Sequence, residues 1–337
     1  MTDHHQRIID TLKNCKRVLV TTHVRPDGDA LGSSAAMVMG MRKMGIDAEV
    51  LLLSHLPTKY SFIFKDFDIR HIDVEKSWPE SFDISRYDAL LVVDTGTWSQ
   101  LPGLRERVEH FSRPKLVVDH HLTQENWANE KLVVTEAAAA GEIVAELLER
   151  WGVAFDHPIA TALYVAIASD TGWFQFSNTR PCTMRLAAKL MEAGVDTDSL
   201  YQHLYQNERP QRVLLQTRAL QSLELLAEGR LAVMTIRKQD FADTGAHVPD
   251  TENLINIPLQ IRTVEVALLF TDPPEGGPIR VSLRSKGQVD VAKFAEQFGG
   301  GGHARAAGLK LSETLSEVRA RVVHSILETL RLQLYPL

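Results

Sequence analysis

The sequence lacks several features that would place it in a special class of protein. Cysteine occurs only as Cys15 and Cys182, which are not spaced as a metal-binding pair. No apolar run reaches the roughly 18 residues that a membrane span requires. The polar N-terminus also lacks the apolar segment of a secretion signal. We therefore expect no association with a membrane and a reduced, cytoplasmic location.

An excess of positive charge is also missing. The chain has 37 Lys and Arg against 43 Asp and Glu, which gives a net charge of −6. Proteins that bind long duplexes usually carry a clear basic excess, because neutralising phosphates dominates that affinity. The charge argues against long duplex nucleic acid as a partner. Short single-stranded RNA or small nucleotides stay open as substrates, because bound metal ions can supply positive charge locally.

Two common catalytic motifs are absent as well. The chain has neither a Walker A loop nor a Gly-x-Ser-x-Gly elbow, so the sequence gives no support to an NTPase or a serine hydrolase. Its length of 337 residues is more than one hydrophobic core usually serves, which favours two domains.

The first half of the chain alternates between strand-like and helix-like segments. Helices are expected at residues 31–44 and 137–151. Short apolar runs predict strands at residues 17–22, 48–53, 89–93, 115–118 and 162–169. This alternation predicts an α/β domain with a mainly parallel sheet.

The second half has a different order of predicted elements. Helical segments at 184–193 and 198–227 come before strand-like segments and two further helices. The strand-like segments are residues 230–237, 264–270 and 279–284, and the helices are 289–298 and 314–332. We predict an N-terminal domain over residues 1–185, a helical connector over 186–228 and a smaller α/β domain over 229–337.

Acidic residues and histidines follow the predicted strands of the first domain. They are His23, Asp27 and Asp29 after the first strand, Asp94 after 89–93, Asp119, His120 and His121 after 115–118, and Asp170 after 162–169. In open α/β sheets the carboxyl ends of the strands gather at one crevice, where ligands bind. We therefore expect these side chains to converge on one site.

Converging carboxylates repel one another unless cations lie between them. Mixed carboxylate and imidazole ligands suit Mn²⁺, with Mg²⁺ or Co²⁺ as substitutes. Two ions roughly 3.5–4 Å apart, bridged by one Asp, form the clamp used for phosphoryl hydrolysis, in which an activated water attacks phosphorus.

The position of a motif after a predicted strand is stronger evidence for a functional site than its residue types alone. A lone Asp at a strand end is more often a helix cap or turn former than a ligand. The chain also contains the same tripeptide twice, because Asp3-His4-His5 repeats Asp119-His120-His121. The first copy follows no predicted strand and is expected at a mobile terminus. Only the second copy predicts a functional site.

These motifs resemble the four motifs of the DHH phosphoesterase superfamily over about the first 180 residues. In the second half, the glycine run before His303 and the segment 281–285 resemble the associated DHHA1 domain. The compact chain is most similar in layout to the nanoRNase/pAp-phosphatase (NrnA-like) group. That resemblance implies an active-site cleft between the two domains and, less strongly, a homodimer.

The resemblance also implies an activity. Members of the group hydrolyse RNA of about two to five nucleotides to mononucleotides, and many convert 3′-phosphoadenosine 5′-phosphate to AMP. Two alternatives from the same superfamily stay open: a phosphodiesterase of cyclic or linear dinucleotides, and an inorganic pyrophosphatase. A phosphoesterase that has lost its chemistry is disfavoured, because each expected ligand position is filled.

The resemblance implies a role for each residue of the site. One metal ion would be held by His23, Asp27 and Asp94. The second would be held by Asp29, Asp94, His120 and Asp170, with Asp94 bridging the two. Asp119 would orient its neighbours, and His121 would contact the scissile phosphate and stabilise its charge.

The glycine run predicts a substrate site in the C-terminal domain. Consecutive glycines let backbone N–H groups form a concave anion site, and nearby basic side chains add charge. The residues concerned are Arg284, Gly299, Gly300, Gly301, Gly302, His303 and Arg305. The alternative is a flexible loop or a helix cap.

Two further segments do not determine which substrate the site prefers. Where the family commonly has a Ser/Thr-rich patch, this chain has the alanine-rich residues 136–142, so a hydroxyl contact from that patch is not expected. After Asp170 come Trp173, Phe174 and Phe176, which either stack on a nucleobase or pack in the core.

Overall fold

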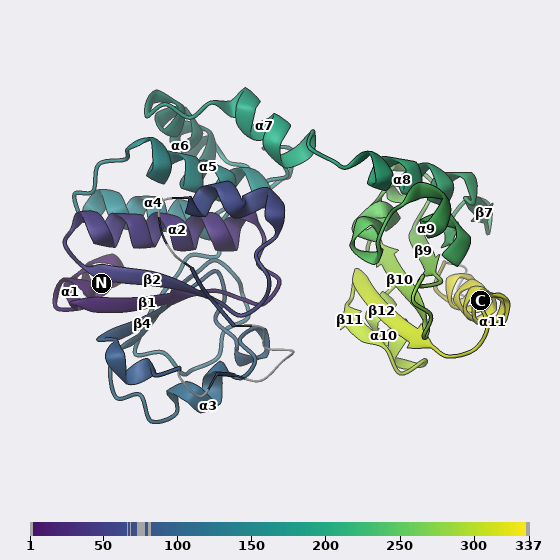
Figure 1. The fold of residues 1–337 in the computed structure, drawn as a ribbon, viewed down its shortest axis with the longest axis horizontal. Helices are drawn as coiled ribbons and strands as arrows, with labels where there is room; N and C mark the ends of the chain where they lie inside the picture. The colour runs from purple at the N-terminus through teal and green to yellow at the C-terminus, as the bar shows by residue number, and fades with distance from the viewer. Residues whose placement is uncertain (1–2, 66, 68, 73–77, 80–81, 335–337) are drawn as a thin grey trace. The chain divides into compact units, whose positions relative to one another are not determined.

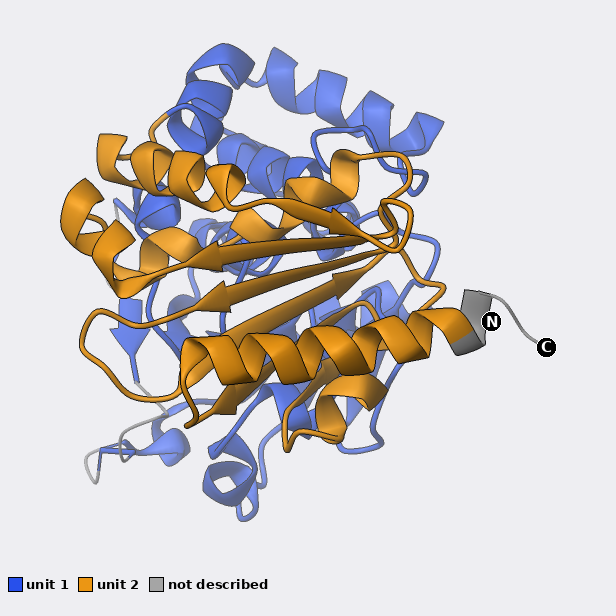
Figure 2. Ribbon diagram, turned by 90° about the vertical axis from the view of Figure 1, so that its right-hand side faces the viewer, with its two compact units in different colours: residues 1–206 blue, residues 207–337 orange. Residues whose placement is uncertain are grey.

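The computed structural model of the chain describes residues 3–65, 67, 69–72, 78–79 and 82–334. They form two compact units, residues 1–206 and residues 207–337, which are coloured separately in Figure 2. Each unit has its own sheet and its own hydrophobic cores, so each is described by itself. None of the helices in the described ranges has the length and hydropathy needed to cross a membrane.

The first unit is built on a six-stranded sheet in which all neighbouring strands are parallel. The strands are β1 (Arg17–Thr21), β2 (Asp47–Leu52), β3 (Ile69–His71), β4 (Ala89–Val93), β5 (Lys115–Asp119) and β6 (Glu130–Val133). Their order is β3-β2-β1-β4-β5-β6. The sequential order therefore reverses between β1 and β4, which confirms the predicted parallel sheet and creates the crevice where such sheets bind ligands.

Helices cover both faces of this sheet (Figure 1). One face packs against α1 (His4–Lys13), α2 (Gly28–Lys43) and α4 (Ala140–Arg150), and α5 (His157–Asp170) packs across α2 and α4. Two further helices, α6 (Pro181–Glu192) and α7 (Thr197–Tyr205), complete that side. The other face carries the short α3 (Leu104–Val108) and the 3₁₀ turns η2 (Ile84–Arg86) and η3 (Trp98–Gln100). A further 3₁₀ turn, η1 (Thr58–Phe64), packs beside α2.

The predicted strand at residues 162–169 is wrong, because these residues belong to α5. Asp156 caps this helix by accepting a hydrogen bond from the Ile159 N–H, and Pro158 occupies its first turn. The helix is buried nearly all round between α2, α4 and α6, so its apolar residues show no amphipathic stripe. Asp170 therefore lies at the end of a helix and not at the end of a strand.

Glycines allow α2 and α5 to approach each other closely. A Cβ on Gly28 would lie 1.8 Å from the Ser169 Oγ, and one on Gly32 would lie 2.2 Å from the Ala162 carbonyl oxygen. Only a residue without a side chain fits at either position. This close packing brings the end of α5 beside the start of α2.

The second unit contains a six-stranded mixed sheet, shown in orange in Figure 2. Its strands are β7 (Glu224–Leu226), β8 (Leu231–Ile236), β9 (Val266–Thr271), β10 (Ile279–Ser285), β11 (Gly301–His303) and β12 (Ala306–Leu311), in the order β11-β12-β10-β9-β8-β7. Only β8 and β9 are parallel. One face packs against α10 (Val291–Glu296) and α11 (Leu315–Leu334), which confirms a smaller α/β unit.

The other face of this sheet is covered over part of its width. The helices α8 (Pro210–Gln221) and α9 (Lys238–Thr244) pack there on β8 and β9. The 3₁₀ turns η4 (Val248–Thr251), η5 (Leu254–Asn256) and η6 (Pro258–Gln260) lie beside them.

Several parts of the structure differ from the predicted elements. The segment 198–227 is not one helix, because α7 ends at Tyr205, Pro210 begins α8, and β7 follows. The predicted connector 186–228 thus contributes α6 and α7 to the first unit, and α8 and β7 to the second. The N-terminal tripeptide is ordered, because Asp3 caps α1 and accepts hydrogen bonds from the N–H groups of His5 and Gln6.

The glycine contacts predict an unequal response to one substitution made at two positions of α2. Gly32→Ala should lower the free energy of unfolding by about 1–3 kcal/mol, because its Cβ would meet backbone atoms of α5. Gly40→Ala is the matched control, because its Cβ would meet the movable end of the Leu148 side chain. Urea unfolding followed by circular dichroism measures both. Equal losses would contradict the close α2–α5 packing.

Candidate metal centre

The ends of the three central strands bring the predicted residues of the first domain together. His23 follows β1, Asp94 follows β4, and Asp119 ends β5, and these strands are neighbours in the sheet. Asp29 lies in the first turn of α2 and Asp170 is the last residue of α5. The close approach of these two helices therefore brings Asp170 to the same place.

The side chains form three groups whose ligand atoms lie within 4.8 Å of one another. The groups are His23, Asp27 and Asp94; Asp29, His120 and Asp170; and Asp94, His120 and His121. Asp94 and His120 each belong to two groups, so the three groups are continuous. Each group has the oxygen and nitrogen ligands that suit a divalent cation.

Asp94 is the most constrained residue of the site. It is 3% exposed and has a positive φ of 64°, a strained conformation for a residue with a side chain. Its Oδ2 lies 3.4 Å from the Nε2 of His23, and its Oδ1 lies 3.4 Å from the Nε2 of His120. The two oxygens thus face different histidines. The buried Oδ1 has no hydrogen-bond partner in the described part of the chain.

Backbone carbonyl groups fix how both histidines face Asp94. The Nδ1 of His23 lies 2.9 Å from the carbonyl oxygen of Val24, and the Nδ1 of His120 lies 3.2 Å from that of Ala137. In each ring Nδ1 donates to the carbonyl, so Nε2 faces the carboxylates, with a proton when the ring is charged and with a lone pair for a metal ion when the ring is neutral. A cation between lone pairs satisfies both sides, as is common for metal-binding histidines. The residues present therefore fit a divalent metal ion.

The buried charges at the site raise several pKa values and so favour bound protons. Burial lowers the pKa values of His23 and His120, but the nearby negative charge of Asp94 outweighs it and raises both to about 9. Burial and the charge of Asp94 raise the pKa of Asp170 to about 6 and hold that of Asp29 well above its usual value. Without a metal ion the site thus retains protons.

Asp29 joins the site to the start of α4. It is fully buried, and its carboxylate accepts hydrogen bonds from the backbone N–H groups of Ala140 (2.6 Å) and Gly141 (2.9 Å) and from the hydroxyl of Ser33 (3.0 Å). Ala139, the N-cap of α4, makes no side-chain capping bond. The carboxylate of another helix thus caps α4, and the alanine-rich segment contacts the site through its backbone.

Asp27 combines two roles that the sequence left as alternatives. Its Oδ1 caps α2 by accepting hydrogen bonds from the N–H groups of Asp29 and Ala30. The same carboxylate lies in the group with His23 and Asp94. A helix cap uses one oxygen, so the other is open to a cation.

Asp119 differs from the other carboxylates because it belongs to none of the three ligand groups, and both of its oxygens are engaged within its own segment. It is fully buried, and Oδ1 lies 2.8 Å from both the His120 N–H nitrogen and the His121 Nδ1. Its Oδ2 accepts a hydrogen bond from the Gln124 side chain. The residue therefore orients His121. The sequence does not single out Gln124, whose amide lies so close to Gly96 that a Cβ there would overlap it.

Two family models cover most of the chain. The model of the DHH family, N-terminal domain, matches residues 17–167, and that of the DHHA1 domain matches residues 228–332. The bifunctional oligoribonuclease and PAP phosphatase NrnA of Thermus thermophilus is 31% identical over 93% of this chain and 90% of that protein. The chain belongs to the DHH/DHHA1 family. Within it, the relatives place the chain in the NrnA-like group.

Two further likenesses agree with this assignment. The protein of the same name from Bacillus subtilis is 25% identical over 90% of this chain and 92% of that protein. The crystal structure of an exopolyphosphatase-related protein from Bacteroides fragilis has a TM-score of 0.86 at 23% identity, over 97% of this chain and 96% of that chain. This structural likeness supports the fold of the DHH and DHHA1 units.

The predicted substrate residues of the DHHA1 domain lie at one edge of its sheet. Gly299 lies in the turn after α10 with a φ of 73°, and its N–H donates to the Glu296 carbonyl. After Gly300, residues Gly301–His303 form the edge strand β11. Arg284 of β10 and His303 of β11 are both opposite Ala306 of β12. The side chain of His303 lies outside the described residues.

Close backbone contacts also explain why glycine occurs in this run. A Cβ on Gly300 would lie 2.4 Å from the Gly308 carbonyl oxygen, and one on Gly302 would lie 2.4 Å from the Ala306 carbonyl oxygen. The turn from α10 into β11 therefore needs glycine for packing. The exposed Arg305 lies beside Gly287, where a Cβ would be 2.9 Å from its Nη2.

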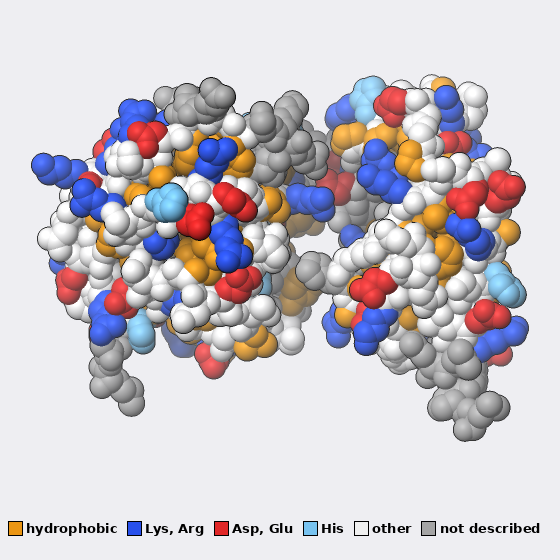
Figure 3. Space-filling view, turned by 90° about the horizontal axis from the view of Figure 1, so that it is seen from below, with side chains coloured by type: hydrophobic (Ala, Val, Ile, Leu, Met, Phe, Trp, Pro, Cys, Tyr) orange, Lys and Arg blue, Asp and Glu red, His pale blue; other side chains and the backbone are white. Residues whose placement is uncertain are grey.

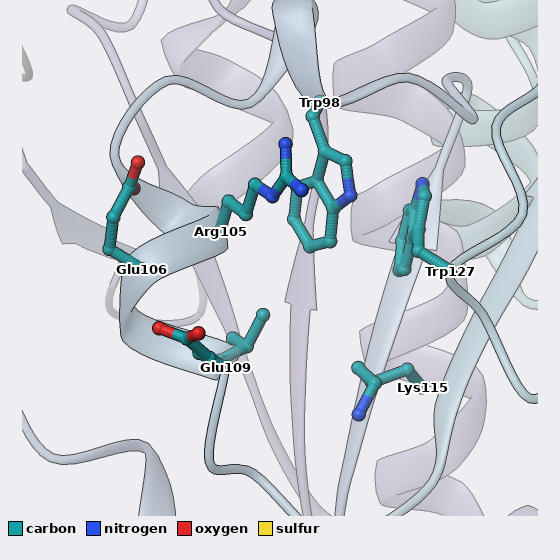
Figure 4. A pocket seen from close by; sticks show the side chains of 7 residues that line it. Trp98, Arg105, Glu106, Glu109, Lys115 and Trp127 are labelled. Carbon is teal, nitrogen blue, oxygen red and sulfur yellow. The ribbon is translucent and has the colours of Figure 1, made fainter.

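A separate hollow of about 430 Å³ lies in the DHH domain, between α3 and the segment after the Asp-His-His motif (Figure 4). The rings of Trp98 and Trp127 lie side by side there, with centroids 4.4 Å apart, and Arg105, Glu109 and Lys115 surround them. No predicted site residue lines this hollow. The DHH site and this hollow are distinct features.

The pKa values predict that metal binding releases protons. In the metal-free protein at pH 7, His23 and His120 carry protons because their pKa values are about 9. Binding of Mn²⁺ at saturation should release roughly two protons or more per chain, so the apparent affinity should rise with pH. Calorimetry in buffers with different ionisation enthalpies measures the number of protons.

The variant His23→Gln is the matched comparison for this measurement. It removes one titrating ring, so the number of released protons should fall by about one. Release of almost no protons by the unchanged protein, or an Mn²⁺ affinity that falls as the pH rises, would contradict the proposal that His23 and His120 bind the metal through Nε2.

Proposed function

We propose that this chain is a metal-dependent phosphoesterase that hydrolyses very short RNA to mononucleotides and 3′-phosphoadenosine 5′-phosphate to AMP. The names of the NrnA relatives support this choice of substrates. The observation that carries the proposal is the shared position of Asp94, whose two oxygens face His23 and His120. A carboxylate between two ligand groups is what a two-metal site for phosphoryl transfer requires.

We assign the ligands of two divalent ions, with Mn²⁺ preferred and Mg²⁺ or Co²⁺ as substitutes. One ion would be held by His23, Asp27 and Asp94. The other would be held by His120 with Asp29, Asp94 and Asp170, which each have an oxygen 3.3–3.7 Å from the His120 Nε2. When bound, the ions polarise the phosphate oxygens and make a bound water acidic enough to attack phosphorus near neutral pH.

His121 and Asp119 act on the phosphate as a pair. The hydrogen bond from the His121 Nδ1 to Asp119 raises the pKa of His121, so its ring is more readily charged. The ring is more than half exposed, whereas Asp119 is fully buried. His121 can therefore reach the scissile phosphate and stabilise its negative charge, while Asp119 holds the ring in place.

The open part of the DHHA1 sheet supports a substrate site there. On the face of β10 opposite the α10–α11 core lie Arg280, Ser282 and Arg284, which are exposed or half-buried. Their partners on β12 include Ala306 and Gly308, so the surface between the basic side chains has little bulk. We propose that Arg284, with Gly299–Gly302, His303 and Arg305, holds a second phosphate of the substrate.

We further propose a homodimer that works in the cytoplasm on short single strands and not on long duplexes. The net charge of −6 supports the preference for short substrates. On the face drawn in Figure 3, basic and acidic side chains are interspersed and form no continuous basic surface. Affinity for a long duplex depends on such a surface.

Product analysis tests the proposed activity directly. With Mn²⁺, the protein should release mononucleotides from end-labelled RNA of a few nucleotides faster than from RNA of about twenty, and should dephosphorylate 3′-phosphoadenosine 5′-phosphate. Asp94→Asn should lower kcat/KM by about a hundredfold or more, because it weakens both ligand groups. Asp3→Asn is the matched control with full activity, because Asp3, in the duplicate tripeptide, caps α1 and pairs with Arg150 and belongs to none of the ligand groups.

The variant Arg284→Ala tests the proposed substrate site of the DHHA1 domain in the same assay. Losing a charged hydrogen bond to a substrate phosphate should raise KM by about tenfold and leave kcat nearly unchanged. Arg280→Ala, on the same face of β10, should have a smaller effect. Inert RNA together with fast cleavage of pyrophosphate would contradict the proposed substrates. Rapid cleavage of long duplexes would contradict the preference for short strands.

A further inference from the structure

The structure separates the three aromatic residues that follow Asp170. Trp173 and Phe174 pack inward, with ring centroids 5.9 and 5.6 Å from that of Tyr164. Both join the main core of the first unit. Phe176 is different, because 59% of it is exposed. Two of the aromatic side chains therefore serve packing, and one is left at the surface.

Phe176 lies directly over Gly172, two residues after the proposed ligand Asp170. A Cβ on Gly172 would be 2.4 Å from the Phe176 Cζ and 2.6 Å from each Cε atom. Only glycine permits the ring to rest so close to the backbone. The contact holds one part of the ring near Asp170 and leaves the rest open to solvent.

A strained turn places the ring there. Gly172, Trp173 and Phe174 have consecutive positive φ values of 56°, 59° and 64°. Left-handed conformations are unfavourable for residues with side chains, and such strain gathers at functional sites. The N–H groups of Gln175 and Phe176 both donate to the Thr171 carbonyl, at 2.9 and 3.0 Å. The turn thus reverses the chain and returns Phe176 to Gly172.

The loop is also tied to the metal centre at its far end. The side-chain amide of Asn178 donates to the carbonyl oxygens of Asp170 (3.1 Å) and Ala138 (3.0 Å). Ala138 adjoins Ala137, whose carbonyl accepts from His120. Both ends of the loop are therefore fixed to segments that hold proposed metal ligands, which keeps the loop that carries Phe176 next to the site.

We propose that Phe176 is a specificity residue whose exposed ring stacks on the base of the nucleotide being hydrolysed. This inference rests on the proposed function. A ring fixed before binding loses little conformational freedom when a base stacks on it. Every nucleobase has a flat π face, so stacking accepts all four bases. The site should thus distinguish phosphate esters that carry a base from those that do not.

Two matched substrates test the inference: a diadenosine RNA dinucleotide, and the same dinucleotide with abasic ribose in place of both nucleosides. Phe176→Ala should raise KM for the diadenosine by about tenfold, with kcat nearly unchanged. The same substitution should leave KM for the abasic substrate unchanged. Phe176→Trp should restore the KM for diadenosine, because its ring also stacks.

The possible failures are distinct from one another. If Phe176→Ala raises KM equally for both substrates, or lowers kcat for both, the ring supports the loop and not the base. If it changes KM for neither substrate, the ring has no contact with the nucleotide. Either result overturns the inference while the proposed function stands. If the unchanged protein cleaves neither substrate, the proposed function itself fails, and the inference with it.

Discussion

The burial of negative charge at the ends of β1, β4 and β5 is the constraint on which this molecule depends. Asp29, Asp94 and Asp119 are almost inaccessible to water, and burying unpaired charge is costly. Asp119 is neutralised by hydrogen bonds from its own motif. Asp29 likewise accepts three hydrogen bonds, from Ala140, Gly141 and Ser33. Asp94 instead faces the Nε2 atoms of His23 and His120, whose Nδ1 atoms donate to backbone carbonyls. Only protons or cations can balance its charge.

The fold supplies this arrangement through a few close contacts. A parallel sheet whose strand order reverses between β1 and β4 leaves a crevice at its carboxyl edge. Gly28 and Gly32 let α5 approach α2, which carries Asp170 to that edge. The start of α4 then donates its N–H groups to Asp29. Helix packing and backbone hydrogen bonds thus position the acidic side chains of the site. A change in the packing of α2 should therefore also shift the proposed ligands Asp29 and Asp170.

The parts of the site that the sequence predicts are those with strong local signals. Buried parallel strands produce apolar runs, so the positions of Asp94 and of the Asp-His-His motif at strand ends could be read directly. Asp170 could be identified as a site residue but not placed, because a helix buried all round looks like a strand. Gln124 and the N–H groups of Ala140 and Gly141 carry no sequence signal, because they act through contacts that only the fold creates. The short strands β3, β6, β7 and β11 are missed because three or four residues show too little periodicity, and β12 is missed because its alanines and glycine give no strand-like pattern.

The central claim is that Asp94 is shared by two metal ions, and anomalous diffraction from crystals soaked in Mn²⁺ tests it most directly. The account predicts two peaks about 3.5–4 Å apart. One peak should lie between His23 and Asp27, the other between Asp29, His120 and Asp170, and Asp94 should contact both. A single peak, or peaks only at exposed carboxylates away from Asp94, would contradict the account.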